Sequence, residues 1–322
     1  MKRNFTAALV ACLLAGAAHA QSWPDRPIRF IAAFPAGGGV DIVARAVAPA
    51  LSARLGQPIV VENRTGAAGA LGSAAVAKAP ADGYTVLITS NPSITIVAAE
   101  EQKRGYDPLK DLRPVVKATV APTVIVTAVE QPYRTMAELI AAAKARPGVI
   151  GFATPGQGST QHFEMEIAKE LLGIDLVHVP YRGTSLFMTD VLSGQVPVGV
   201  TATPASTRYI QGGRLNGLAV LSPRRSSVLP EIPTLRELTR ADFDGVPSWF
   251  GFLVPAGTPD AIVRRLESEI LAVLRDPEIR AKFAPLGMDV VAEDSASFQK
   301  SNEAETRLLR SVMKRVGITS TQ

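Results

Sequence analysis

Cysteine is almost absent from this chain of 322 residues, in which Cys12 is the only one. The first twenty residues, MKRNFTAALVACLLAGAAHA, have a basic start, a long apolar run and an Ala-His-Ala ending. This pattern predicts a signal peptide, residues 1–20, that is cleaved after Ala20 and directs the chain to the periplasm. The mature chain would then lack cysteine, which excludes disulfides, cysteine nucleophiles and thiolate metal sites. Lipoprotein processing at Cys12 stays open as an alternative, although the apolar run continues past that residue.

Histidine is also scarce, and only His162 and His178 follow the predicted cleavage site. Neither belongs to a zinc-binding spacing such as H-E-x-x-H, and the chain has no G-x-S-x-G nucleophile motif. No acidic and basic side chains stand out as an acid–base pair. We therefore expect no catalytic residue, no metal and no cofactor. An exported enzyme that acts on a small carboxylate is kept as an alternative.

Long apolar runs and a one-sided charge are missing after the first twenty residues. No later segment has the 18 or so uninterrupted apolar residues that typically span a membrane. The chain has 34 Lys and Arg against 29 Asp and Glu, and these charges are scattered without forming a basic face. A nucleic-acid partner is therefore not expected. We predict a soluble protein that is a monomer.

Short β-branched runs alternate with helical patterns along the chain, which is typical of an α/β fold. About 300 mature residues exceed one comfortable hydrophobic core. Val115–Val129 is a β-rich stretch interrupted at Ala121-Pro122, and Ser248–Gly257 is a second apolar stretch. We interpret both as crossings between two lobes. The prediction is two mostly parallel sheets flanked by helices, with a ligand cleft between a domain of residues 22–124 and 250–322 and a domain of residues 125–249.

Two glycine-rich loops each follow a predicted strand and precede a predicted helix. They read AGGGVD, from residue 36, and TPGQGST, from residue 154, where Ser159 is a natural N-cap. Free N–H groups and the positive end of a helix dipole favour an anion at such a loop. Neither loop completes a P-loop or a G-x-G-x-x-G motif, so a carboxylate is favoured over a nucleotide phosphate. Ordinary strand-to-helix turns remain the alternative for each loop.

Several ordered blocks resemble one known family. They include WPDRPIRFIAAFPAGGGVDIVAR, VVENRTGAAGALGSAAVAKAPADGYTVL and ATPGQGSTQHFEMEIAKELLGIDLVHVPYRGT. The chain resembles the substrate-binding proteins of tripartite tricarboxylate transporters, also called the Bordetella uptake gene (Bug) family, over essentially its whole mature length. The resemblance implies a two-lobed, type 2 periplasmic binding protein fold that closes on a small organic carboxylate. It also implies delivery to the integral membrane subunits of a secondary transporter, and a same-fold sensor that signals to a membrane kinase is the alternative.

The resemblance further implies which residues contact the ligand. From the first lobe these are Phe34, Ala36, Gly37, Gly38, Asp41, Ser90 and Asn91. From the second lobe they are Thr154, Gly156, Ser159, Thr160, His162, Tyr181, Gly183, Thr184 and Thr203. Some have structural alternatives: Asp41 as a helix cap paired with Arg45, and Tyr181 as wall packing. Trp249, on the predicted return crossing, is interpreted as hinge packing.

Overall fold

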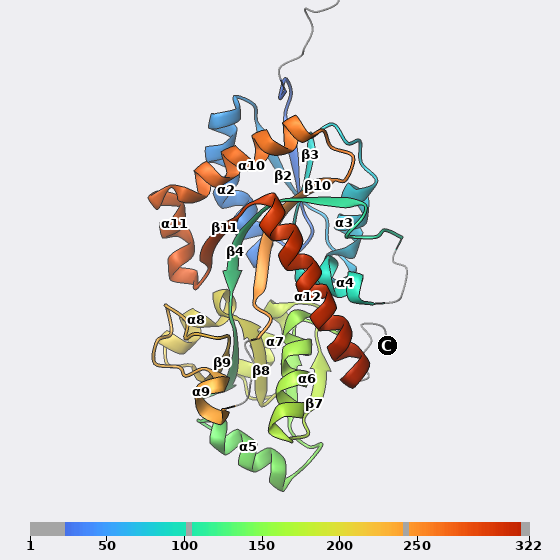
Figure 1. Cartoon of the computed structure of the whole chain (residues 1–322). Coiled ribbons are helices and arrows are strands. Elements are labelled where there is room, and N and C mark those ends of the chain that lie inside the picture. Colours follow the sequence, from blue (N-terminus) through green and yellow to red (C-terminus); the bar gives the residue numbers. More distant parts are fainter. Residues whose placement is uncertain (1–22, 101–104, 241–244, 317–322) are drawn as a thin grey trace, which may run out of the picture.

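The structure is a computed structural model that describes residues 23–100, 105–240 and 245–316. The predicted signal peptide, its cleavage site after Ala20 and Cys12 lie outside the described residues. Within them the chain forms two lobes, one above the other in Figure 1. Each lobe is built on its own β-sheet, as the alternation of strand and helix patterns predicts.

The first lobe contains a six-stranded sheet of order β11-β4-β10-β3-β1-β2. Its strands are β1 (Ile28–Ala32), β2 (Ile59–Asn63), β3 (Thr85–Ser90), β4 (Leu112–Ala121), β10 (Ser248–Pro255) and β11 (Asp289–Glu293). Around it lie α2 (Gly39–Leu55), η1 (Ala67–Gly69), α3 (Ala70–Ala77), η2 (Asn91–Ser93), α4 (Thr95–Ala99), α10 (Asp260–Arg275), α11 (Pro277–Phe283) and η3 (Ala284–Leu286). Apolar side chains of α2 and α10 pack together with those of the sheet in one core.

The second lobe contains a five-stranded sheet of order β7-β6-β8-β5-β9. Its strands are β5 (Thr123–Ala128), β6 (Gly151–Thr154), β7 (Val177–Pro180), β8 (Val198–Ala202) and β9 (Leu215–Leu221). Its helices are α5 (Met136–Ala145), α6 (Thr160–Leu172), α7 (Thr184–Leu192), α8 (Thr203–Gln211) and α9 (Leu235–Thr239). The two-sheet architecture flanked by helices confirms the predicted fold class.

The expectation of mostly parallel sheets is wrong, because both sheets are mixed. β1 is parallel to β2 and β3, and β6 is parallel to β7 and β8. However, β10 is antiparallel to β3 and β4, β11 to β4, and β5 to β8 and β9. Parallel neighbours need a crossover such as a helix, whereas β4, β5 and β10 belong to the crossings between lobes. The short strand β11 was not predicted from the sequence, in which its five residues come soon after the helical segment η3.

Three segments connect the lobes. β4 and β5 are separated only by Pro122 and lie in different sheets, which confirms the predicted crossing at Ala121-Pro122. The chain returns to the first sheet through β10, and α12 (Ser295–Val316) then runs along both lobes (Figure 1). An apolar cluster joins α4 of the first lobe, α6 of the second and α12 through Ile96, Ala99, Phe163, Leu309 and Met313.

The parallel strands position the glycine loops. In an α/β sheet, the carboxyl ends of neighbouring parallel strands share one edge, where ligands commonly bind. The segments that follow β1, β2 and β3 begin at such an edge in the first lobe, and α6, α7 and α8 begin at the equivalent edge in the second. A hollow lined by residues 67–68 and 157–158 shows that the two edges meet.

Candidate functional site

The first glycine loop, residues 35–39, joins β1 to α2, and residues 35–38 are exposed. Gly37 has a φ of 78°, in the left-handed region that favours glycine. Gly39 is needed for space, because a Cβ there would lie 2.4 Å from Cζ of Phe250. Gly38 is the N-cap of α2 and supplies no side-chain cap. The N–H groups of the first helical turn therefore have neither an intrahelical partner nor a side-chain cap.

Asp41 holds this loop from within the protein. Its carboxylate accepts hydrogen bonds from Gly37 N, Arg45 Nε and Asn63 Nδ2, each at 2.9 Å. Burial alone would raise the pKa of Asp41, but these hydrogen bonds and the Arg45 charge together hold it below its ordinary value. Both carboxylate oxygens are used in this way. The alternative pairing of Asp41 with Arg45 is present, whereas its bond to Gly37 N holds the loop and does not cap α2. Asn63, which also donates to Phe34 O at 3.1 Å, was not predicted.

The second glycine loop, residues 155–159, joins β6 to α6 and is half-buried to buried. Ser159 is the N-cap of α6, and its hydroxyl accepts from His162 N at 3.3 Å, which confirms the predicted cap. Gly156 N donates to Thr154 Oγ1, and Gly158 N donates to His162 Nδ1, both at 3.3 Å. Neutral polar groups therefore hold the second loop, in contrast to the ionised Asp41 of the first.

A stacked histidine pair supports the second loop. The rings of His162 and His178 lie 3.9 Å apart between centroids and 14° from parallel. His178 Nε2 also lies 2.7 Å from Thr154 Oγ1. Burial, reinforced by His178 and Lys169, lowers the pKa of His162 to about 3, and burial with Lys169 lowers the pKa of His178 to about 4. Both rings are therefore neutral at pH 7, which allows them to stack without repulsion.

The first residue of α6 carries an unused hydroxyl. Thr160 Oγ1 is buried and has no hydrogen-bond partner among the residues that the structure describes. Leaving a buried hydroxyl unpaired is costly, and such a group in a native protein calls for an explanation. Thr160 lies in the helical turn whose N–H groups have no intrahelical acceptor. The start of α6 thus offers donors and one hydroxyl to a further group.

The turn of residues 181–183 packs back on the second loop. Tyr181 N donates to Thr154 O at 3.2 Å, and Gly183 N donates to Pro155 O at 2.9 Å. The Tyr181 hydroxyl donates to Asp190 at 2.5 Å, and burial together with this bond raises the pKa of Tyr181 to about 12. Thr184 begins α7 beside this turn. The predicted residues 154–162 and 181–184 are therefore brought together in one wall.

Ser90, Asn91 and Thr203 follow strands at the same two edges, but their side chains bond to groups other than the glycine loops. Ser90 donates to Asn91 Oδ1 at 3.2 Å, and Asn91 also accepts from Trp249 N at 2.9 Å. Asn91 Nδ2 donates to Glu305 of α12, so its amide belongs to the connection between the lobes. Thr203, in the second lobe, donates from its hydroxyl to Gly287 O of the first lobe at 3.0 Å. Asn91 therefore links the first lobe to the return crossing and to α12. Thr203 links the second lobe to the first.

A hollow of about 130 Å³ lies where the two lobes meet. It is lined by Ala67, Ala68, Pro92, Ile96, Val97, Glu100, Gln157 and Gly158. Ala67 and Ala68 have left-handed backbone angles, with φ of 47° and 51°, which are strained for residues other than glycine. Such strain is concentrated at functional sites. This loop, GAAGALG in the sequence, was not assigned to the site, because it completes no known anion-binding spacing.

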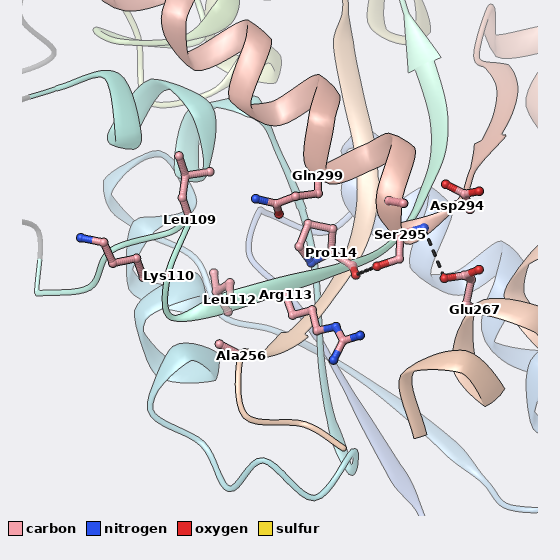
Figure 2. Close-up of a pocket in the computed structure, with 11 residues that line it drawn as sticks. Leu109, Lys110, Leu112, Arg113, Pro114, Ala256, Glu267, Asp294, Ser295 and Gln299 are labelled. Atoms are coloured by element: carbon pink, nitrogen blue, oxygen red, sulfur yellow. Dashed lines mark hydrogen bonds between the residues drawn. The ribbon is translucent and has the colours of Figure 1, made fainter. Parts of the chain in front are cut away.

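A larger hollow, of about 570 Å³, lies on the first lobe around Pro114 and Ser295 (Figure 2). Its cations are paired within the protein: Arg113 with Asp260 at 2.6 Å and Lys110 with Asp107 at 2.9 Å. Ser295 donates from its N–H to Glu267 and from its hydroxyl to Pro114 O, as the dashed lines show. None of the predicted site residues lines it, so the lobe interface remains the candidate site.

Within 23–100, 105–240 and 245–316, no group of three His, Asp or Glu side chains has an arrangement that could hold a metal ion. In the same ranges no helix combines the length and apolar character that crossing a bilayer requires.

Known proteins match this chain over most of its length. A family model described as "Tripartite tricarboxylate transporter family receptor" matches residues 43–318. BugT of Bordetella pertussis is 37% identical over 275 residues, 85% of this chain and 84% of BugT. The structure of R. palustris Rpa4515 with adipate is 31% identical with a TM-score of 0.85, and covers 92% of this chain and 99% of its own. MatC from Rhodopseudomonas palustris with bound malate is 26% identical with a TM-score of 0.82, and covers 90% and 99%. These likenesses confirm the fold, and the chain belongs to the family of tripartite tricarboxylate transporter receptors.

Proposed function

We propose that this protein is a periplasmic receptor that closes on a small organic carboxylate and delivers it to the membrane subunits of a tripartite transporter. The observation that carries the proposal is the pair of strand–glycine loop–helix units, one at the facing edge of each lobe. Each unit leaves first-turn N–H groups without an intrahelical partner, and the second adds the buried Thr160 hydroxyl. A carboxylate between the loops would accept from both sides and so favour the closed arrangement.

The chemistry of the loops supports a carboxylate in preference to a phosphate. His162 of α6 and His178 of β7, which support the second loop, are both neutral, and Arg45 beside the first loop is already paired with Asp41. A site with a few neutral donors suits one carboxylate group, whereas a nucleotide phosphate is usually met by cations or a metal as well. Two similar structures hold adipate and malate. We therefore propose a di- or tricarboxylate class for this chain.

The proposed receptor is an exported protein of two domains. Residues 22–124 with 250–322 and residues 125–249 would be the two moving domains, with export completed by cleavage after Ala20. A binding role without catalysis is supported by the family model, whose description is that of a receptor. A sensor of the same fold remains a second candidate, because docking of a closed form on a kinase would use the same lobes.

Thermal unfolding of the exported protein tests the function. The panel contains adipate, malate, mono- and tricarboxylates, with ATP and NAD as controls. A ligand at a hundred times its dissociation constant should stabilise the fold by about 2.7 kcal/mol, a shift of a few degrees. A shift with nucleotides alone would refute the proposal, and so would the absence of any shift after refolding from denaturant, which removes bound ligand.

A matched pair of variants tests the site. Thr160→Val removes the unpartnered hydroxyl at the start of α6, and Thr119→Val removes an equally buried and unpartnered hydroxyl from β4. A hydrogen bond to a charged group contributes about 1.5–3 kcal/mol, so Thr160→Val should weaken carboxylate binding tenfold or more. Thr119→Val should leave the affinity unchanged. Equal affinities for the two variants, measured by calorimetry, would remove Thr160 from the site.

A further inference from the structure

The return crossing, residues 245–249, forms the hinge segment between the lobes and lies between the fully buried Glu164 and the half-buried Glu305, neither of which the ligand site uses. Val246 N donates to Glu164 Oε1 of α6 at 2.9 Å. Trp249 Nε1 donates to Glu305 Oε2 of α12 at 3.0 Å. Glu164 belongs to the helix that starts at the second glycine loop, and Glu305 belongs to the helix that runs along both lobes. The hinge is therefore held on two sides by carboxyl groups.

The same turns of α6 contact both crossings. Gln161 Nε2 donates to Ser248 Oγ of β10 at 3.0 Å and lies 3.5 Å from Thr123 Oγ1 of β5. Thr123 also forms a side-chain hydrogen bond with Glu164. The first turn of α6 thus presents Ser159 and Thr160 to the candidate site, and its next residues hold the two hinge strands. Hydrogen bonds of the first turns of α6 therefore connect the start of this helix to both hinge strands.

The two glutamates differ in the donors around them. Glu305 accepts from Asn91 Nδ2 at 2.5 Å, Thr95 Oγ1 at 2.6 Å and Trp249 Nε1. Glu164 is fully buried, and its Oε2 has no partner in the part of the chain that the structure describes. Donors stabilise an ionised carboxylate, so Glu305 is the better place for a charge and Glu164 the better place for a proton.

The charges around the pair support this division. Burial raises the pKa of Glu164 to about 8, and the charge of Glu305 adds to the effect. Burial also raises the pKa of Glu305, against its hydrogen bonds and the charge of Lys117 on β4. Lys117 is itself paired with Glu293 of β11 at 2.9 Å. The histidines of α6 and β7 titrate near pH 3 to 4, so they do not interfere between pH 6 and 9.

We propose that Glu164 and Glu305 form a hinge pair that positions α6 and holds one proton while the lobes are closed, and that opening of the lobes, which admits water to the pair, releases this proton. The inference rests on the proposed function, because it assumes that ligand binding closes the lobes. In the pH range where the closed form binds this proton more tightly than the open form does, closure takes up a proton. Ligand affinity would fall as the pH rises above about 8.

Calorimetry with adipate and with malate between pH 6 and 9.5, in two buffers of different ionisation heat, tests the linkage. The wild type and Glu170→Gln, an exposed charge change on the same helix, should lose up to about tenfold in affinity per pH unit above pH 8. Glu164→Gln, which keeps the shape and the acceptor for Val246 N, should show no such dependence. Glu305→Gln should move the onset to lower pH. An unchanged slope in Glu164→Gln, or a flat wild type, would overturn the proposal.

An infrared measurement separates this proposal from the receptor function. At pH 7 the carbonyl band of a protonated carboxyl group should gain intensity when adipate or malate is added to the wild type or to Glu170→Gln, and should not change in Glu164→Gln. If neither ligand shifts the thermal unfolding, the receptor function fails for these ligands and the hinge pair falls with it. If a ligand binds to the wild type without a change in this band, the hinge pair is refuted while the receptor function stands.

Discussion

The two glycine loops have the same backbone design and opposite surroundings. The first loop is exposed, and the ionised carboxylate of Asp41 holds it together with Arg45 and Asn63. The second is largely buried, and neutral groups hold it: the cap of Ser159 and the stacked pair of His162 and its partner on β7. An anion between them would meet one loop already organised by a negative charge and another whose donors are shielded from water. Desolvated donors interact more strongly with a charge, so we expect the second loop to dominate affinity and the first to control access.

Acidification should produce the largest difference between the loops. Both histidines are neutral when folded and become protonated after unfolding below their ordinary pKa of 6.5, so stability falls as the pH drops from 6.5 towards 4. The pKa of Asp41 is below its ordinary value of 3.8, so its contribution to the stability of the fold is present above pH 3.8 and is lost only at lower pH. Between pH 7 and pH 5 the histidine pair should cost about 2–4 kcal/mol, while the first loop is unaffected.

Urea unfolding at pH 7, 6 and 5 measures this effect. The Glu164→Gln background is used, because a raised carboxyl pKa makes stability fall with rising pH and would partly cancel the histidine slope. Replacing His178 with Gln should reduce the slope by about half, since one of two titrating groups remains. The same slope with and without His178 would mean that the pair does not carry the pH dependence.

Removal of the side chain that holds each loop should have the next largest effect. Asp41→Ala leaves Gly37 N and the Asn63 amide without their acceptor and should cost about 3 kcal/mol of unfolding free energy. Ser159→Ala removes one neutral cap and should cost about 1 kcal/mol. Chemical denaturation of the two variants at pH 7 makes the comparison. Equal losses would contradict the view that a charged network holds only the first loop.

Substitution of one glycine in each loop should have the smallest effect. A Cβ at Gly156, where φ is 155°, would lie 3.0 Å from Tyr181 O, so Gly156→Ala should cost about 2 kcal/mol. Gly37 has a φ of 78° but nothing within 4 Å of a built Cβ, so Gly37→Ala should cost only about 1 kcal/mol. Thermal melting of both variants measures and compares these two losses of stability. A larger loss at Gly37 would mean that the exposed loop is the more tightly constrained one.

Local features of the fold could be predicted from the sequence. The cap at Ser159 and the crossing at Ala121-Pro122 agree with the structure. The sheet directions and β11 do not, because the direction of a crossing strand depends on the path between lobes. His178 illustrates the same limit at the site: its neighbours in LVHVP indicate only burial, whereas its contact with Thr154 comes from strand pairing.

What the sequence alone determined was whatever depends on a few neighbouring residues: the two glycine loops, the cap at Ser159 and the crossing at Ala121-Pro122. The tertiary structure decided what depends on distant partners. Asn91 and Glu305 are 214 residues apart in the chain, and Trp249 meets Glu305 across 56. A cap or a left-handed turn is settled by local backbone geometry, but the burial and pKa of a carboxyl group depend on which helix packs over it. The hinge pair was therefore visible only once α6 and α12 were in place.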